Sequence, residues 1–448
     1  MIDKIPQMTL TDWLNMGSFA CSCGKTHTPG TANVIIESGA IGKLPDLLKK
    51  AGITKPFLLS GKHTFQAAGD KVCATLETAG IPYGKFVYDC DRVLPTEHAV
   101  GSAVMHFDHS CDGVVAIGSG VINDIGKILS NTTGRTYIIV GTAPSMDGYA
   151  SPTSSMELDG LKVSLNSAFP WAIVGDLDVL SKAPMKLLLS GVGDMLAKYV
   201  SLCEWEIAKI LVDEYYCPVV AQMVQTALQR CLDAGPALLR REPEAVKAVM
   251  EGMVIAGMAM KYAGISRPAS GVEHYFSHIW DMRSLAFGTE AELHGIQCGI
   301  ATLYALKVYD YLRQVTPDKE KALAYVSRFS LQQWNAQLEA FVGPGAQAMI
   351  AEEEKAGKYD ARKHAARFER IADRWDEILS VINKLPTHER LLRFMNGIGA
   401  PVSAEEFAVT PEQVRTTFTM TKDIRDKYVA SRLLWDLGLL EDVARILP

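Results

Sequence analysis

Six short runs of apolar and β-branched residues, separated by helix-like stretches, constrain the fold of this chain more than any other feature. The runs lie between Asn33 and Val179 and read NVII, PFLLS, YGKFVYD, GVVAIGSG, TYIIVGTAP and WAIVGD. Two of the intervening helical segments are followed by Gly52 and Gly80, the residue type that commonly follows a helix C-terminus. Strands that alternate with helices form βαβ units and a parallel sheet. We therefore predict an α/β domain with a Rossmann-like, parallel wound sheet.

The pattern changes twice further along the chain. A polar turn at Asp159–Gly160 between strand-like runs predicts a β-hairpin. After Ser181 the strand signal nearly vanishes, and we expect helices over residues 185–212, 218–232, 242–263, 293–315, 318–340 and 355–383. We predict an α/β domain over residues 1–182 and an all-helical C-terminal domain over residues 183–448, with the active site in the cleft between them.

The composition narrows the class of function. The 448 residues are 48% hydrophobic, carry a formal net charge of −6 and have a pI of about 6.0. A chain without an excess of positive charge is a poor candidate for binding nucleic acid or an anionic membrane. We therefore favour a protein that acts on small molecules. We find no run of about 18 apolar residues and no signal-peptide pattern at the N-terminus, so we expect a cytoplasmic protein.

The cysteines form one tight cluster. Nine cysteines scattered along a long chain argue for reduced thiols rather than a disulfide framework. Cys21, Cys23 and His27 resemble half of a zinc site, but the matching half is missing nearby and ligand sets are usually paired. We interpret the cluster as a polar N-terminal hairpin that turns at Gly24.

A glycine-containing turn follows the fourth apolar run. In GVVAIGSGVINDIGK a buried strand leads directly into Gly118 and Gly120, and we expect a helix to begin near Asn123. Glycines let a phosphate approach the backbone, and a helix N-terminus presents unpaired N–H groups to the anion. The spacing matches neither GxGxxG nor GxxxxGK[ST], so the turn alone is weak evidence. As nucleotide-binding residues we single out Gly118, Gly120, Asp124 and Lys127.

The next run ends in a polar segment that strengthens this interpretation. In TAPSMDGYAS the hydroxyl groups belong to Thr142, Ser145 and Ser151, and Asp147 adds a carboxylate. A wound sheet places this segment at the same carboxyl edge as the glycine turn.

Three downstream stretches carry residues suited to a divalent metal. Asp194, His274 and His294 each lie beside glycines in helical context, and a carboxylate with two imidazoles suits zinc, iron or nickel. His278 lies one helical turn after His274, as a further ligand, a proton relay or a substrate contact. We regard Glu273 as structural.

The GSGVINDIGK turn, the TAPSMDGYASP loop and the Asp-His-His series together resemble the iron-containing alcohol dehydrogenase and dehydroquinate synthase superfamily. Within it, SMDGYASP and SGVEHYFSH are most similar to the sn-glycerol-1-phosphate dehydrogenases, including their bacterial relatives associated with arabinose operons. The resemblance covers most of the chain.

The resemblance implies an NAD(P)H-linked, metal-dependent reduction of dihydroxyacetone phosphate to sn-glycerol 1-phosphate. It also implies that Asp194, His274 and His294 hold one divalent ion, zinc or nickel first and iron next, and that the turn and the Thr142–Ser151 loop bind the nucleotide. We expect His278 and Asp147 to act in catalysis, a substrate phosphate near Lys261, Arg267 or Ser270, and a homodimer or higher homo-oligomer.

Three alternatives remain open. One is a polyol or alcohol dehydrogenase of the same superfamily without phosphate specificity, and another is a dehydroquinate synthase-like lyase. The third is a nucleotide-binding protein that has lost turnover. The run PFLLSGKHTF lacks the acidic residue that usually selects an unphosphorylated ribose, so both NADH and NADPH stay open.

Overall fold

The computed structural model describes residues 2–448, which divide into two compact units. Among these residues, the first unit comprises 2–195 and Pro218–Ile265, and the second comprises Leu196–Cys217 and Ser266–Pro448.

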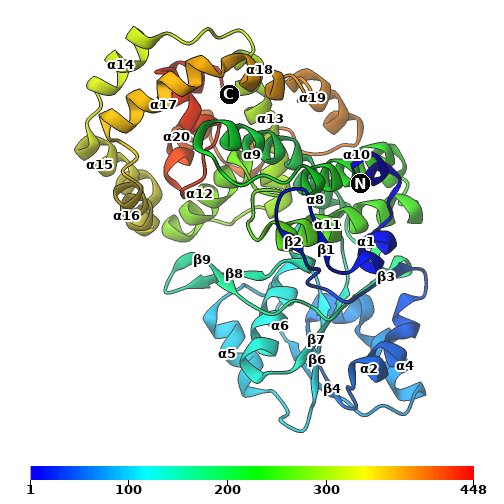
Figure 1. Ribbon diagram of the computed structural model, residues 1–448. Helices are drawn as coiled ribbons and strands as arrows, with labels where there is room; N and C mark the ends of the chain where they lie inside the picture. Colours follow the sequence, from blue (N-terminus) through cyan, green and yellow to red (C-terminus); the bar gives the residue numbers. More distant parts are fainter. Residues whose placement is uncertain (1) are drawn as a thin grey trace. The chain divides into compact units, whose positions relative to one another are not determined.

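The six predicted strands are confirmed, and all of them belong to one parallel sheet in the first unit (Figure 1). The sheet order is β3-β10-β7-β6-β4-β5, and every neighbouring pair is parallel. The strands are β3 (Asn33–Glu37), β4 (Pro56–Gly61), β5 (Gly84–Tyr88), β6 (Gly113–Gly118), β7 (Thr136–Gly141) and β10 (Ala172–Asp176).

Apolar side chains on both faces explain why this segment forms a wound sheet. One face packs Leu58, Val115 and Ile138 against a helical layer that contains α2 (Leu44–Ala51) and α4 (Asp70–Thr78). The opposite face packs against α6 (Gly120–Thr133), which contacts β4, β6 and β7, and α5 (Glu97–Met105) packs beside α6. Because the sheet is buried on both faces, the sequence of each parallel strand is a nearly continuous apolar run.

The strand order places a topological switch point between β4 and β6. The chain leaves β4 toward β5 on one side and leaves β6 toward β7 on the other. Ligands of open α/β sheets bind in the crevice at the carboxyl ends of such strands. The glycine turn that follows β6 therefore lies where this fold binds ligands.

Two antiparallel hairpins accompany the sheet. The predicted hairpin is confirmed as β8 (Thr153–Leu158) and β9 (Leu161–Asn166), joined by Asp159 and Gly160 with φ of 52° and 74°. Positive φ at both central residues matches the tight turn that Asp-Gly favours. The N-terminal hairpin is confirmed as β1 (Phe19–Ala20) and β2 (Thr26–His27), with Gly24 in its turn.

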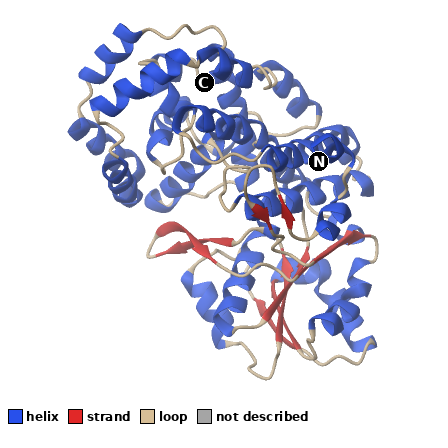
Figure 2. Cartoon of the chain, in the orientation of Figure 1, coloured by secondary structure: helices blue, strands red, loops and turns tan. Residues whose placement is uncertain are grey.

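Helices make up the regular structure of the described chain after β10 (Figure 2). Their bounds are α7 (Leu177–Leu180), α8 (Met185–Leu196), α9 (Lys198–Val212), α10 (Pro218–Leu238), α11 (Pro243–Ala263), α12 (Val272–Phe287), α13 (His294–Leu312), α14 (Lys319–Ser327), α15 (Leu331–Val342), α16 (Ala346–Ala356), α17 (Ala361–Asp373), α18 (Trp375–Ile382), α19 (His388–Gly397), α20 (Pro411–Met420), α21 (Ala430–Asp436) and α22 (Leu440–Ala444). Before the sheet lies α1 (Leu10–Met16), and α3 (Lys62–Thr64) follows β4.

Several predicted helices were wrong in extent. The single helix expected over residues 185–212 is two helices, α8 and α9, and those expected over 318–340 and 355–383 are also broken. Apolar periodicity continues through these breaks, so it does not reveal them. None of the helices in residues 2–448 is both long and apolar enough to cross a membrane.

Candidate active site

The backbone of the turn between β6 and α6 can be approached closely by a phosphate group. A Cβ on Gly118 would lie 2.5 Å from Cβ of Ile122, so only glycine fits there. The helix begins at Gly120, three residues earlier than expected, because Ser119 already has an extended backbone in the N-cap position. No side chain caps this N-terminus, so its first N–H groups are available to an anion.

Asp124 and Lys127 lie deeper in the unit and hold the neighbouring loop. The Nζ of Lys127 donates to the carbonyl oxygens of Gly148 and Thr153, at 2.7 and 3.0 Å, and to Asp124 at 3.2 Å. Asp124 in turn accepts from the N–H of Ser155. Burial raises the pKa of the Asp124 carboxyl and lowers the pKa of the Lys127 ammonium. Their role as nucleotide contacts stays a prediction.

The Thr142–Ser151 loop is fixed from the sheet side. The N–H of Thr142 donates to the carbonyl of Gly118, and the hydroxyls of Ser119 and Ser145 are hydrogen-bonded to each other. These contacts join the carboxyl ends of β6 and β7. Ser151 is buried, and its hydroxyl is hydrogen-bonded to the hydroxyl of Thr153, the first residue of β8.

The same loop is fixed by α8 through a very close approach. A Cβ on Gly191 would lie 1.9 Å from the carbonyl oxygen of Pro144. The hydroxyl of Ser190 donates to the carbonyl of Ser145, and the carboxylate of Asp194 accepts from the N–H of Asp147 at 2.8 Å. Asp194 is fully buried. Two of the predicted site residues, Asp147 and Asp194, are thus in direct contact.

In the second unit, His274 is oriented by the residue before it. The Nδ1 of His274 lies 2.8 Å from a carboxylate oxygen of Glu273, which also accepts from the N–H of Gly271. A carboxylate that accepts from Nδ1–H leaves Nε2 with its lone pair. Burial raises the pKa of Glu273 to about 7. Glu273 is therefore a positioning residue for His274, a role that the sequence did not reveal.

His294 is oriented in the same way by a different group. Its Nδ1 lies 2.8 Å from the hydroxyl of Ser277, which donates to the side chain of Gln297 at 2.6 Å. A hydroxyl that donates to Gln297 accepts from Nδ1–H, so His294 also keeps the lone pair on Nε2. The rings of His274 and His294 are 5.0 Å apart.

Cys298 completes this cluster within the second unit. It lies one turn after His294 on α13, and its sulfur is 3.6 Å from Nε2 of His294. His274, His294 and Cys298 offer ligand atoms within 4.8 Å of one another. Cys298 is not among the ligands predicted from the sequence, although the i, i+4 spacing of His294 and Cys298 was a signal.

Three further polar residues, His278, Arg267 and Lys427, lie on α12 or contact groups near it. The ring of His278 lies 6.4 Å from that of His294. Arg267 is buried and engaged by Glu214 and by the carbonyl of Tyr428. The Nζ of Lys427, a residue not predicted from the sequence, donates to the carbonyl of Ser270.

A wound sheet with an uncapped glycine turn at its switch point, in a chain with two anchored imidazoles, is the arrangement that we expect of a metal-dependent nicotinamide dehydrogenase. Residues 35–184 match the iron-containing alcohol dehydrogenase family. A glycerol-1-phosphate dehydrogenase [NAD(P)+] of Halalkalibacterium halodurans is 32% identical over 293 residues, which cover 64% of this chain and 73% of the relative. The chain belongs to the glycerol-1-phosphate dehydrogenase family, and the resemblance predicted from the sequence is confirmed.

Two further comparisons extend over the length of the chain. A protein of the same name from Bacillus licheniformis is 29% identical over 429 residues, covering 94% of this chain and 93% of the relative. The solved structure of a probable glycerol dehydrogenase from Sinorhizobium meliloti superposes with a TM-score of 0.58 at 16% identity, covering 94% of this chain and 99% of that one. The structural likeness shows the fold.

Proposed function

We propose that this chain is an enzyme that uses NAD(P)H and a divalent metal to reduce dihydroxyacetone phosphate to sn-glycerol 1-phosphate. The observation that carries the proposal is the pair of anchored imidazoles in a chain whose relatives are named glycerol-1-phosphate dehydrogenase [NAD(P)+]. The cofactor supplies the hydride.

We assign the metal to Asp194, His274 and His294, with zinc or nickel favoured over iron. The two Nε2 lone pairs fit a divalent ion, and Cys298 beside them favours zinc. Asp194 lies two residues before the second unit begins. Within the second unit, Lys198 donates to the carbonyl of Ala269, and Ala269 is five residues before His274. When bound, the ion supplies Lewis-acid polarisation of a ketone oxygen.

The residues of the chain itself then have separate tasks. The uncapped α6 N-terminus after Gly118 binds the cofactor phosphates, and the clamped Thr142–Ser151 loop positions the nicotinamide half. His278, one turn beyond His274, moves a proton to the substrate oxygen, while Asp147 holds Asp194 through its N–H. The domain bounds that we propose are an α/β domain over residues 1–182 and a helical domain over residues 183–448.

The substrate phosphate is assigned to Lys427 and Ser270. Partial burial and the nearby charges of Arg267 and Arg425 lower the pKa of Lys427 to about 7, so a phosphate dianion would stabilise its ammonium form. Arg267, considered from the sequence, already pairs with Glu214. We therefore propose Lys427 instead of Arg267 as the cation that binds the substrate phosphate.

The cofactor preference is assigned to NADPH. Strand β4, the neighbour of β6 at the switch point, ends at Gly61, where a carboxylate would repel a 2′-phosphate. Lys62 follows and supplies a cation, which pairs with Asp91 at 3.3 Å on the surface. Because Asp91 already balances the charge of Lys62, the proposal depends on the missing carboxylate at Gly61.

The test is an assay of metal-reconstituted protein for NAD(P)H oxidation with dihydroxyacetone phosphate, run beside dihydroxyacetone. We expect a much higher kcat/KM with the phosphorylated ketone and loss of metal and turnover in His274→Ala. Equal rates with both ketones would favour a polyol dehydrogenase. Cofactor binding without turnover would leave only a nucleotide-binding protein. Sedimentation tests the proposed homodimer, and cell fractionation tests the proposed cytoplasmic location.

A further inference from the structure

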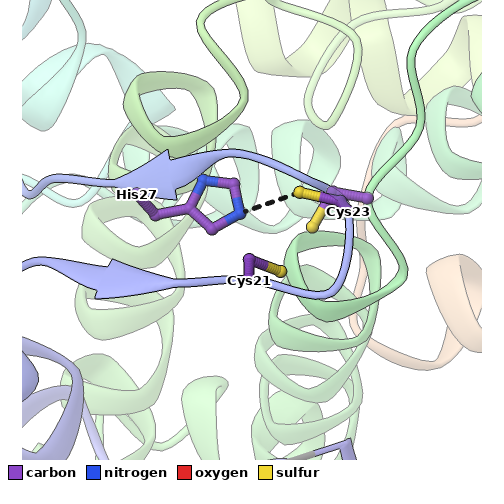
Figure 3. A group of neighbouring side chains, drawn as sticks. Cys21, Cys23 and His27 are labelled. Carbon is purple, nitrogen blue, oxygen red and sulfur yellow. Dashed lines mark hydrogen bonds between the residues drawn. The ribbon is translucent and has the colours of Figure 1, made fainter.

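The N-terminal hairpin gathers three soft or borderline metal ligands outside the proposed active site. Cys21 and Cys23 lie in the turn between β1 and β2, and His27 ends β2 (Figure 3). Their ligand atoms lie within 4.8 Å of one another, and the sulfur of Cys23 is 3.5 Å from Nε2 of His27. The turn is closed by a hydrogen bond from the N–H of Cys21 to the carbonyl of Lys25.

His27 is held in the tautomer that a metal requires. Its Nδ1 lies 2.8 Å from the carbonyl oxygen of Tyr262, and a carbonyl can only accept. The proton is therefore on Nδ1, and the lone pair of Nε2 points toward the sulfur of Cys23. His27 is fully buried, so this orientation is not set by solvent. A backbone carbonyl behind a ligating imidazole is the usual outer support of a metal site.

The spacing fits tetrahedral zinc. With Zn–S of about 2.3 Å and Zn–N of about 2.0 Å, a tetrahedral ion separates a sulfur and a nitrogen ligand by about 3.5 Å. The distance between Cys23 Sγ and His27 Nε2 is the same. Two thiolates and an imidazole leave one ligand of a closed site to be found.

The helix pairing of the first unit indicates the fourth ligand. Helices α10 and α11 form an antiparallel pair, in which the sulfur of Cys231 donates to the carbonyl of Ala248. In this register the start of α10 at Pro218 lies opposite the end of α11 near Tyr262. The hairpin is attached at that end of α11, through His27 to Tyr262. Cys217 is bonded to Pro218 and is fully buried.

We propose that Cys21, Cys23, His27 and Cys217 hold one structural zinc ion. The set is C-x-C-x3-H from the hairpin, plus a cysteine about 190 residues later that reaches it only in the folded chain. A site with four protein ligands has no open position, so its zinc is structural. It fastens the N-terminal hairpin to the start of α10 and the end of α11.

The experiment counts and characterises zinc in the His274→Ala protein, which lacks the ion of the proposed active site. We expect one zinc per chain by elemental analysis, and X-ray absorption that shows three sulfurs at about 2.3 Å and one nitrogen. Cys23→Ser on the same background should lose the zinc. The matched control is Cys90→Ser, which changes an exposed cysteine outside the cluster and should keep it.

Other outcomes overturn the proposal in distinct ways. A His274→Ala protein without metal, prepared in zinc-containing medium, would mean that Cys23 is only a thiol hydrogen-bonded to His27. Two sulfurs instead of three would exclude Cys217 as a ligand. If Cys23→Ser does not fold, the absorption spectrum of the His274→Ala protein decides alone. Loss of dehydrogenase activity does not enter these readouts, so failure of the proposed function stays distinguishable.

Discussion

The substitution Gly191→Ala tests whether the close packing of α8 against the Pro144 loop is what holds the proposed cofactor loop in place. The added Cβ would lie 1.9 Å from the carbonyl oxygen of Pro144 and 2.8 Å from Cε of Met253. Ordinary contact begins at 3.4 Å, so the backbone contact has to lengthen by about 1.5 Å. The methionine end can rotate away, but the carbonyl belongs to the loop backbone.

Two hydrogen bonds are lost if α8 and the loop separate by this distance. They are Ser190 Oγ to the carbonyl of Ser145, at 2.9 Å, and the N–H of Asp147 to Asp194, at 2.8 Å. Overpacking costs about 1–3 kcal/mol and each of the two hydrogen bonds about 1 kcal/mol, so we expect a destabilisation of about 3–5 kcal/mol. A displacement of about 1 Å also costs on the order of 100-fold in rate.

Thermal unfolding and steady-state kinetics measure the two effects. We expect Tm to fall by about 5–10 °C, and kcat/KM for NADPH to fall by on the order of 100-fold. The matched control is Gly101→Ala on α5, where an added Cβ meets nothing within 4 Å and φ is not positive. That change should be neutral or stabilise the protein by about 0.5–1 kcal/mol. Equal Tm and kinetics in the two variants would refute the reasoning.

Three further predictions concern other parts of the molecule. Glu273→Gln should weaken zinc binding at the proposed active site by about 10- to 100-fold, because the amide holds Nδ1–H of His274 less well; chelator competition that finds equal affinity would show that Glu273 does not orient the imidazole. Asp176→Asn should destabilise the protein by about 2 kcal/mol at neutral pH, because the buried carboxylate accepts from Lys71 and from the N–H of Ile41. Burial raises the pKa of Asp176, but these hydrogen bonds outweigh it and bring the pKa below 3.8, so this stabilisation is present above about pH 4 and is lost as the pH falls further; a stability difference that stays constant into acid would contradict this assignment. Gly61→Asp should shift cofactor preference toward NADH, because the new carboxylate repels a 2′-phosphate, and an unchanged ratio of kcat/KM for the two cofactors would place the ribose elsewhere.

The sheet could be predicted from the sequence because parallel strands are buried on both faces. Strands such as β6 read as unbroken apolar runs, which local pattern analysis detects directly. The helix ends were harder. The expected helix over 185–212 breaks between α8 and α9, where the apolar residues Leu196 and Ala197 continue the pattern. A break that is set by packing leaves no local signal.

The metal-ligand residues could be proposed from the sequence, but the residues that orient them could not. His274 and His294 could be proposed because, with Asp194, they form a series of three potential ligands that each lie beside glycines in helix-like segments. Adjacent residues on a helix face different directions, which predicts only a structural role for Glu273, yet its carboxylate lies 2.8 Å from Nδ1 of His274. Cys217 is separated from Cys23 by almost half the chain. Only the antiparallel pairing of α10 and α11 suggests that they meet.

The pairing of β3 with β10 has a consequence for the order of folding during synthesis. β3 is the first strand of the sheet to leave the ribosome, and its ladder partner, Ala172–Asp176, is the last. The strands β4, β5, β6 and β7 can associate in the meantime, because each finds a neighbour among themselves. The segment Asn33–Glu37 must wait unpaired until about 140 further residues have emerged. Ribosome-stalled chains that end before β10 should therefore expose β3 to proteases and chaperones, while the central strands are already protected.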